Sequence, residues 1–246
     1  MQQRVATRGL TADTLKIIAI VAMVIDHAAP AVASAESPLG LLLHFIGKLT
    51  GPIMCFFIAE GYHYTRNVKK YALRLLIFAA ISQLPFQILF QNGRLIPYPL
   101  SLNMIFTLFC GLLALWAWDR IPNPMLRALA VVGATVATLW SDWSLFGVLF
   151  VLAFGVFHGD RKKQLIAFAV CAGVKILYNL LGDFIVHQSP IVELSRLGMF
   201  CVIPLLMLYN GTRKNNNFGK WFFYIFYPAH MLLFGVINLL FIGVKG

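Results

Sequence analysis

Charged residues are scarce in this sequence. Asp, Glu, Lys and Arg make up only 12% of the 246 residues, whereas 60% are hydrophobic and the mean hydropathy is +0.79. A soluble globular domain is about half apolar and a quarter charged. The composition therefore excludes a soluble domain and predicts an all-α, polytopic membrane helical bundle. The length suits one compact unit, so we expect residues 1–246 to form a single integral-membrane helical domain.

The sequence also lacks the motifs of several enzyme classes. It contains no Walker loop, no G-x-S-x-G elbow, no HExxH and no dinucleotide-binding glycine pattern. No CxxC or Cys/His metal spacing occurs, so no metal site is predicted. We interpret the four cysteines, which all lie in apolar runs, as small buried hydrophobes without disulfides: Cys55, Cys110, Cys171 and Cys201.

Soluble basic regions are missing as well, although the net charge is +11. A nucleic-acid-binding protein would concentrate its Lys and Arg residues on one soluble domain. Here they form short clusters between apolar runs, as orientation in a membrane requires, so no nucleic-acid partner is expected. The polar N-terminus has no signal-peptide cleavage site before the first apolar run, which we expect to be retained as a span.

The apolar runs predict about nine membrane spans, since one span needs about 20 mostly apolar residues. The fifth and sixth are short and are separated only by residues 141–143, which predicts a tight helical hairpin. The second contains Lys48, Gly51 and Pro52, which suits a short interfacial helix followed by the true span. The expected spans are 14–33, 40–64, 71–91, 100–118, 125–140, 143–158, 164–182, 190–209 and 219–243.

Lys and Arg residues alternate between the loops. The loops rich in them contain Arg66, Lys69 and Lys70, then Arg120, then Arg161, Lys162 and Lys163, then Arg213, Lys214 and Lys220. The intervening loops contain Arg94 alone. Because basic loops stay in the cytoplasm, the N-terminus is predicted to be cytoplasmic and, with nine spans, the C-terminus to lie outside.

Two ionisable residues interrupt the first span, "LKIIAIVAMVIDHAAP". Asp26 and His27 lie about 12 residues, or roughly 18 Å, from its cytoplasmic end, near the middle of the bilayer. A central Asp costs about 3 kcal/mol, so it should face the bundle interior or water. The same helical face carries small residues, including Ala19 and Ala22, that let a neighbouring helix approach closely. A functional pair and a structural pair that only fixes packing both remain open.

A further histidine lies at similar depth in the last span, in "FFYIFYPAHMLLF". His230 is about 11 residues into that span, and Pro228 before it frees a backbone carbonyl. Histidine is the side chain best suited to moving a proton near neutral pH. The alternative is a buried histidine that only satisfies its own hydrogen bonds.

Glu60, His63 and Arg66 follow one another at spacings of three at the cytoplasmic end of the second span. With Lys69 and Lys70, Arg66 could bind a phosphate-bearing ligand, since its guanidinium offers a bidentate fork. The alternative is a set of interfacial anchors, although Glu60 is deep for that role.

Two further features concern single charges inside spans. Glu193 and Arg196 are three residues apart and can pair with each other. Lys175 lies well inside its span and needs a partner, for which Asp26 is a candidate.

Four segments resemble the TraX family of membrane proteins. They are "LKIIAIVAMVIDH", "GPIMCFFIAEGYHYTRNVKKYALRLLIFAAISQLPF", "NMIFTLFCGLLAL" and "YNGTRKNNNFGKWFFYIFYPAHMLLF". The family is named for a conjugation-system enzyme that acetylates the N-terminus of pilin, and it is similar to the wider transmembrane acyltransferases that use cytoplasmic acyl-CoA. The resemblance implies a protein of the bacterial inner (cytoplasmic) membrane with a functional set formed by Asp26, His27, Glu60, Arg66 and His230.

The resulting hypothesis is an intramembrane acetyltransferase with acetyl-CoA as donor. Arg66, Lys69 and Lys70 would hold its phosphates, beside Glu60 and His63. His27, oriented by Asp26, would act as general base or transiently carry the acyl group, and His230 would donate to the thioester oxygen or the leaving thiolate. The acceptor would be an amine or hydroxyl of a peptide, glycan or small molecule, in contact with membrane lipid.

Two alternatives remain open. The buried ionisable residues would also suit a proton relay in a proton-coupled transporter or flippase. A non-catalytic assembly factor would need no buried acid–base pair.

Overall fold

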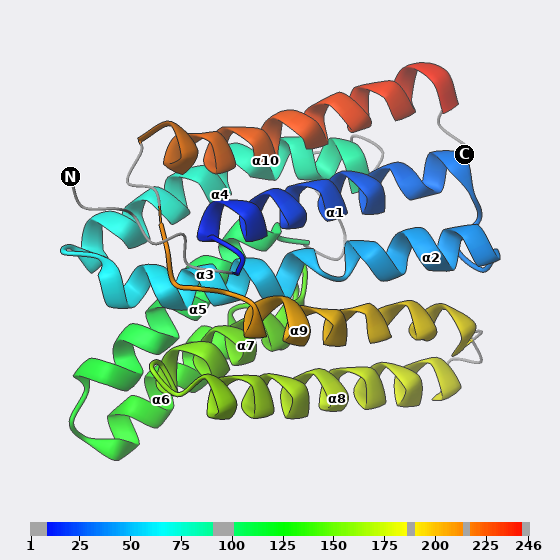
Figure 1. Cartoon of the computed structure of the whole chain (residues 1–246). Coiled ribbons are helices and arrows are strands. Elements are labelled where there is room, and N and C mark those ends of the chain that lie inside the picture. Colours follow the sequence, from blue (N-terminus) through cyan, green and yellow to red (C-terminus); the bar gives the residue numbers. More distant parts are fainter. Residues whose placement is uncertain (1–8, 91–100, 186–189, 214–216, 243–246) are drawn as a thin grey trace.

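A computed structural model describes residues 9–90, 101–185, 190–213 and 217–242. Within these ranges the chain is helical, and its β-type pairing is limited to two isolated bridges, Leu10 with Tyr209 and Leu102 with Ser141. The all-α prediction is therefore confirmed (Figure 1).

Ten α-helices and two irregular helices follow one another in the described ranges. They are α1 Ala12–Val32, α2 Pro38–Gly47, α3 Thr50–Tyr64, α4 Val68–Phe90, α5 Met104–Arg120, α6 Pro124–Val136, α7 Ser144–Val156, α8 Arg161–Ile185, the 3-10 helix η1 Pro190–Cys201, α9 Val202–Met207, α10 Asn217–Ile237 and the π-helix η2 Asn238–Ile242.

Six helical segments of the described chain are long and apolar enough to cross a membrane. They are Ala12–Val32, Pro38–Tyr64, Val68–Phe90, Arg161–Phe184, Pro190–Met207 and Trp221–Leu240. The expectation of about nine spans exceeds this number, and the difference lies in α5, α6 and α7. α6 and α7 have 13 residues each, which corresponds to about 20 Å, whereas the hydrocarbon core is about 30 Å thick.

The helices share two ends of the molecule. α1, α4, α8 and α10 begin at one end, where α3 and α5 finish (Figure 1). We call this the basic end, because the loops with Arg66, Arg120, Arg161 and Arg213 lie there. The other end is called the opposite end.

α6 and α7 form the predicted hairpin, but residues 137–143 separate the helices instead of only 141–143. Trp143 adopts a left-handed conformation with φ 64°, which lets the chain reverse within a few residues. The Leu102 N–H donates to the Trp140 carbonyl at 2.9 Å. In return, the Asp142 N–H donates to the Leu102 carbonyl at 2.8 Å. The hairpin tip is therefore bonded to the segment before α5, between the longer helices.

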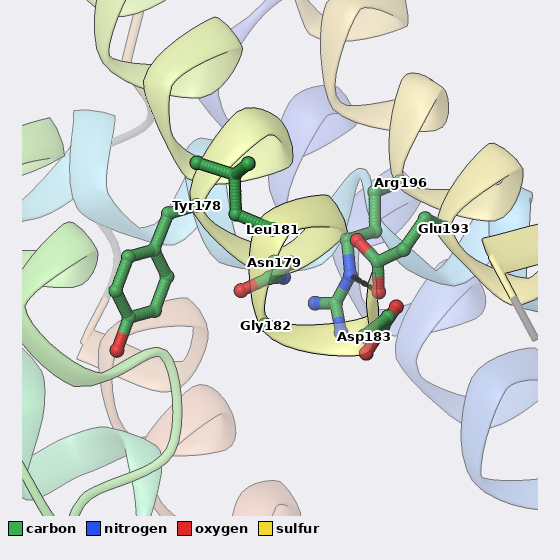
Figure 2. Close-up of a pocket in the computed structure, with 7 residues that line it drawn as sticks. All are labelled: Tyr178, Asn179, Leu181, Gly182, Asp183, Glu193 and Arg196. Atoms are coloured by element: carbon green, nitrogen blue, oxygen red, sulfur yellow. Dashed lines mark hydrogen bonds and ion pairs between the residues drawn. The ribbon is translucent and has the colours of Figure 1, made fainter. Parts of the chain in front are cut away.

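The second predicted span is broken, as its composition suggested. α2 ends at Gly47 and α3 begins at Thr50, with Lys48 and Leu49 between them. α2 packs against α1 on one side and against η1 on the other, and η1 packs against α8. Glu193 and Arg196 of η1 form the predicted pair beside the end of α8 (Figure 2).

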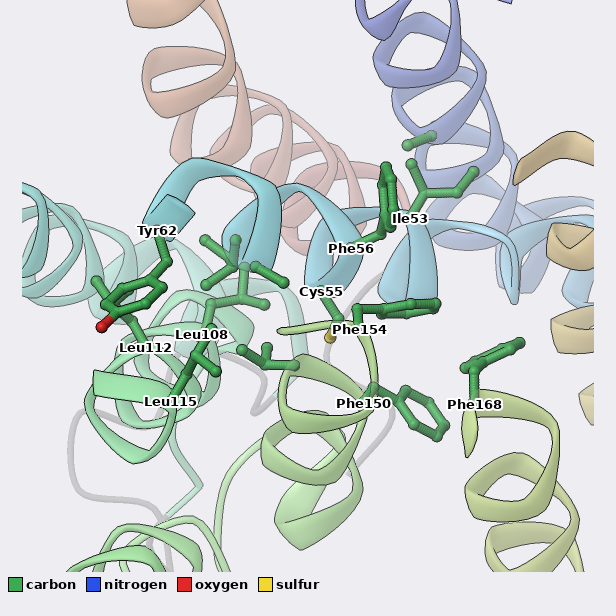
Figure 3. Packing of buried hydrophobic residues seen from close by; sticks show 14 of the residues in the cluster. Ile53, Cys55, Phe56, Tyr62, Leu108, Leu112, Leu115, Phe150, Phe154 and Phe168 are labelled. Atoms are coloured by element: carbon green, nitrogen blue, oxygen red, sulfur yellow. The ribbon is translucent and has the colours of Figure 1, made fainter. Parts of the chain in front are cut away.

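The apolar core lies where α3, α5, α7 and α8 meet (Figure 3). Phe56 and Phe154 pack edge to face at 5.4 Å between ring centroids, and Phe154 stacks on Phe168 at 5.2 Å. All four cysteines are free. Cys55 and Cys110 are buried as predicted, whereas Cys171 is only partly buried and Cys201, at the end of η1, is exposed.

Candidate functional site

His27 of α1 and His230 of α10 are in direct contact. Nδ1 of His27 lies 2.9 Å from Nε2 of His230. Their rings are nearly parallel, with an interplanar angle of 3° and centroids 5.0 Å apart. His230 is buried and His27 is partly buried. The fold thus joins two histidines that are 203 residues apart in the sequence.

The surrounding hydrogen bonds assign the proton positions of this histidine pair. Nδ1 of His230 lies 2.9 Å from the Phe226 carbonyl oxygen, which can only accept. Nδ1 of neutral His230 therefore carries the hydrogen, and its Nε2 accepts from the Nδ1–H of His27. The remaining nitrogen of His27, Nε2, then holds a lone pair. His27 is consequently the member of the pair with a free basic nitrogen.

Asp26 faces a different helix. Its Oδ1 lies 2.7 Å from Nδ1 of His44 on α2, and its Oδ2 lies 3.8 Å from Nζ of Lys48, the residue that follows α2. The prediction that Asp26 orients His27 is therefore wrong, because the carboxylate contacts His44 and Lys48 instead. Consecutive residues of a helix do not share a face, so Asp26 points to α2 while His27 points to α10.

The sequence reasoning did not identify His44. A usable signal was present, because His44 and Lys48 are four residues apart and so lie on one face of α2. What the sequence could not supply was the partner helix that this face contacts.

Gly47 permits the close approach of α1 and α2. A Cβ atom at this position would lie 2.4 Å from Cβ and Cγ of Asp26. We expect Gly47→Ala to displace Asp26 from His44 and to destabilise the protein by about 1–3 kcal/mol, as overpacking does. Thermal unfolding in detergent would measure this loss. Gly173→Ala is the matched control, since open space surrounds Gly173, and equal effects of the two substitutions would contradict the prediction.

Further charges surround Asp26 and Lys48. Asp142, in the α6–α7 turn, lies within electrostatic range of Asp26, Lys48 and Lys175. The ammonium of Lys175 lies over the rings of Trp143, at 5.6 Å, and Phe146, at 4.9 Å. Lys175 therefore contacts the Trp143 and Phe146 rings, and not Asp26 as the sequence had suggested.

The Glu193–Arg196 pair lines a pocket between α8 and η1 with a volume of about 390 Å³ (Figure 2). Asn179 of α8, with its amide oriented to accept, receives hydrogen bonds from the same guanidinium. In the part of the chain that the structure describes, no group of three His, Cys, Asp or Glu side chains could hold a metal ion.

Glu60 forms the centre of a second polar cluster, at the basic end. It is buried, and its two carboxylate oxygens contact Nη2 of Arg213 at 3.0 Å and Nε2 of His158 at 3.2 Å. The His158 ring stacks on that of His63, with centroids 3.9 Å apart. Burial, and next the neighbouring His63, lower the pKa of His158, against the opposing effect of the Glu60 carboxylate.

His63 is held by its own hydrogen bond. Its Nε2–H donates to the Gly155 carbonyl at 2.9 Å. Glu60 and His63 thus bind protein groups, and the Glu60 carboxylate would repel a phosphate. Both are placed to hold cations and backbone in position beside a ligand.

Four cations at the basic end have aromatic or ion-pair contacts with α3 and its neighbours, and we call them the inner cations: Lys16, Arg74, Arg161 and Arg213. Arg213 lies over Tyr64 at 4.3 Å, and Arg161 lies over Tyr209 at 5.3 Å.

Lys16 and Arg74 complete the group from α1 and α4. Lys16 lies over Phe57 at 5.2 Å, and Phe57 packs edge to face on Tyr209, the ring that Arg161 covers. Arg74 lies over Tyr71 at 5.6 Å.

Two buried donors of the inner cations are unpaired. Nε of Arg74 and Nη1 of Arg161 have no hydrogen-bond partner among the residues described. An unsatisfied donor on a charged group is costly, and each one in a folded protein calls for a ligand, a water or another explanation. The inner cations therefore have free capacity for an anion.

Arg66, Lys69 and Lys70, the predicted phosphate ligands, lie elsewhere at the basic end. All three are exposed, in the α3–α4 turn and at the start of α4. The Lys70 N–H donates to the Asn67 side chain at 2.9 Å, which caps this turn. The inner cations come from four separate segments, and no local spacing in the sequence reveals that they meet.

The fold and the two clusters define a class: a helical membrane protein with a histidine pair between long helices and a cation group at one end. Within this class, the chain belongs to the TraX family, because the family model "TraX protein" matches residues 11–238. The predicted family is thereby confirmed. The probable fimbrial assembly protein FimC, serogroup H1, of Dichelobacter nodosus is 34% identical over 229 residues, which cover 91% of this chain and 93% of that protein. No solved structure matches the chain.

Proposed function

We propose that this protein is an intramembrane acetyltransferase that moves an acetyl group from acetyl-CoA to an acceptor amine or hydroxyl. The proposal extends to a role in pilus or fimbria assembly, which family membership and the similarity to a fimbrial assembly protein support. The acceptor would then be the N-terminus of a pilin-type peptide. The basic end faces the cytoplasm by the positive-inside rule, and the protein lies in the bacterial inner membrane.

The observation that carries the proposal is the hydrogen bond between His27 and His230. It leaves the lone pair of His27 on Nε2, where it can take a proton from the attacking amine or hydroxyl. The protonated ring then keeps its Nδ1–H bond to His230, which becomes charge-assisted and stronger. Positioned base catalysis of this kind contributes about 10²–10⁴-fold to a rate. His27 is thus the base, and His230 is a positioning residue.

The inner cations fit the donor better than the exposed residues of the α3–α4 turn. Acetyl-CoA supplies an acetyl thioester and carries several phosphate charges. Arg74 and Arg161 offer buried, unpaired donors, and guanidinium groups bind phosphate as bidentate forks. Arg66, Lys69 and Lys70 would attract the anion from solution.

The helices connect the two clusters. Lys16 and His27 lie on α1 and are roughly 17 Å apart along its axis, at about 1.5 Å per residue. Lys16 also lies over Phe223 of α10, at 5.1 Å, and His230 is on the same helix. An elongated donor bound by the inner cations would therefore extend along α1 and α10 toward His27.

We expect the purified wild-type protein to transfer label from acetyl-labelled CoA to a peptide with a free N-terminus. Mass spectrometry of the peptide would locate the added acetyl group, and a peptide with a blocked N-terminus and no other amine or hydroxyl is the control. Uptake into vesicles driven by a pH gradient, without transfer or acetyl-CoA binding, would contradict the proposal and favour the transporter.

A further inference from the structure

His44 and Asp26 form an acid–histidine pair that the proposed transfer does not yet use. Nδ1 of His44 lies 2.7 Å from Oδ1 of Asp26. An ionised carboxylate can only accept, so Nδ1 carries the hydrogen, and in the neutral ring Nε2 holds a lone pair. The His44 side chain is 19% exposed, against 22% for Asp26. The His44 ring is therefore not fully enclosed by the protein.

The pair lies next to His27 through Asp26. Asp26 and His27 are adjacent on α1, and His27 lies within electrostatic range of both Asp26 and Lys48. This part of the bundle thus holds two imidazole rings with unprotonated Nε2 atoms, one facing α10 and one on α2, on neighbouring faces of α1. Each ring is oriented through its Nδ1–H, the first by His230 and the second by Asp26.

The charged groups around the His44–Asp26 pair come from several elements. Lys48, just after α2, lies 3.8 Å from Oδ2 of Asp26, Asp142 of the hairpin lies within electrostatic range of Asp26, Lys48 and Lys175, and the Glu193–Arg196 pair lies on η1, which packs against α2. The neutral ring is the form that accepts a proton.

Two bases suit one kind of acceptor in particular. A hydroxyl loses one proton when it is acetylated, and one base suffices. An alkylamine at neutral pH is an ammonium ion, because its pKa is about 7.7–8.0 for an α-amino group and higher for a lysine side chain. It must lose one proton before it can attack and a second as the amide forms.

We propose that His44 is a second base, which deprotonates an acceptor that arrives as an alkylammonium ion. The inference rests on the proposed function, in which the acceptor is a primary amine, and adds the role of His44. Nε2 of His44 takes the first proton, and the nitrogen lone pair then forms the N–C bond as the C–S bond breaks. His27 takes the second proton and returns it to the thiolate. The first proton leaves His44 for water, so that one proton is released for each acetyl group transferred.

Asp26 and Lys48 act as positioning residues in this scheme. The Asp26 carboxylate holds the His44 ring and stabilises its protonated form, as a carboxylate does for a histidine base. Lys48 lies 3.8 Å from the other carboxylate oxygen of Asp26, Oδ2. Neither residue needs to contact the acceptor.

The test compares His44→Gln with wild type on two acceptors, a peptide with an alkylammonium N-terminus and a weakly basic amine that is already neutral at pH 7. We expect the substitution to lower transfer to the ammonium acceptor by about 10²-fold at pH 7. The loss with the neutral amine should be at least ten times smaller. The rate with the ammonium acceptor should recover as the pH is raised above the pKa of the acceptor. Asp26→Asn should change the pH profile in the same direction.

The outcomes separate this inference from the proposed function. If the wild type is active but His44→Gln lowers the rates of transfer to both acceptors equally, His44 is only structural and the inference is wrong. If wild type acetylates a hydroxyl and not an amine, the inference is also wrong, although the acetyltransferase stands. If wild type transfers to neither kind of acceptor, the proposed function itself fails. His27→Gln should lower the rates of transfer to both acceptors, and these rates should not recover at high pH, which distinguishes the two bases.

Discussion

Replacing His27 with Gln should lower acetyl transfer by about 10²–10⁴-fold, the range that a positioned general base contributes. Glutamine keeps an amide that can bond to His230, yet it has no nitrogen lone pair that accepts a proton at neutral pH. The rate of label transfer from acetyl-CoA measures the effect. Thermal unfolding in detergent should give an unchanged midpoint, which shows that the loss lies in the chemistry.

His230 provides the matched comparison. In His230→Gln, the amide oxygen can still accept from the Nδ1–H of His27, whereas His230→Leu leaves that N–H without a partner. We therefore expect His230→Leu to lose more activity than His230→Gln, and both to lose less than His27→Gln. Normal transfer by a folded His27→Gln protein would rule out His27 as the base.

Replacing Arg161 with Gln should raise the KM for acetyl-CoA by roughly 10- to 100-fold, with a smaller change in kcat. A hydrogen bond to a charged group is worth about 1.5–3 kcal/mol, which corresponds to this factor. Arg161 lies over the Phe56 and Tyr209 rings and has a buried, unpaired Nη1. Initial rates as a function of donor concentration measure KM, and the binding of desulfo or dephosphorylated analogues would locate the lost contact.

Lys70→Gln is the control for this prediction. Lys70 is exposed, and exposed charges contribute about 0–1 kcal/mol and are screened by salt. Its KM should change less than about fivefold, and the change should vanish at high salt. A larger effect at Lys70 than at Arg161 would contradict this prediction. It would indicate that the phosphates bind at the α3–α4 turn, as the sequence spacing predicts.

Some of the polar site could be predicted from the sequence. Asp26 and His27 stand out in an apolar run because an ionisable residue inside a membrane is costly. The similar depths of His27 and His230 could also be predicted, because the rise per residue of a helix is constant and each position can be counted from the end of its span. The Glu193–Arg196 pair follows from a spacing of three on one helix. Each of these inferences concerns a single helix.

Partners on different helices could not be predicted in the same way. Asp26 was expected to orient His27, but it contacts His44 and Lys48, because adjacent residues on a helix face different neighbours. Likewise, Arg74, Arg161 and Arg213 each lie in a basic segment, and the sequence does not show that Arg213 contacts Glu60 or that Arg161 lies over Phe56 and Tyr209. Hydrophobicity also predicted spans at α5, α6 and α7, whose 17, 13 and 13 residues are fewer than the about 20 of a typical span.

The sequence by itself determined that the chain is helical and membrane-bound, that it belongs to the TraX family, and which residues carry charge at costly depths. These properties depend on composition and on periodicity along one chain segment. Only the tertiary structure decided that His27 meets His230, that Asp26 meets His44, and that Arg213 and His158 meet Glu60. The reason is physical: a helix fixes the direction of each side chain relative to its own axis, whereas the packing of whole helices decides which side chain lies opposite.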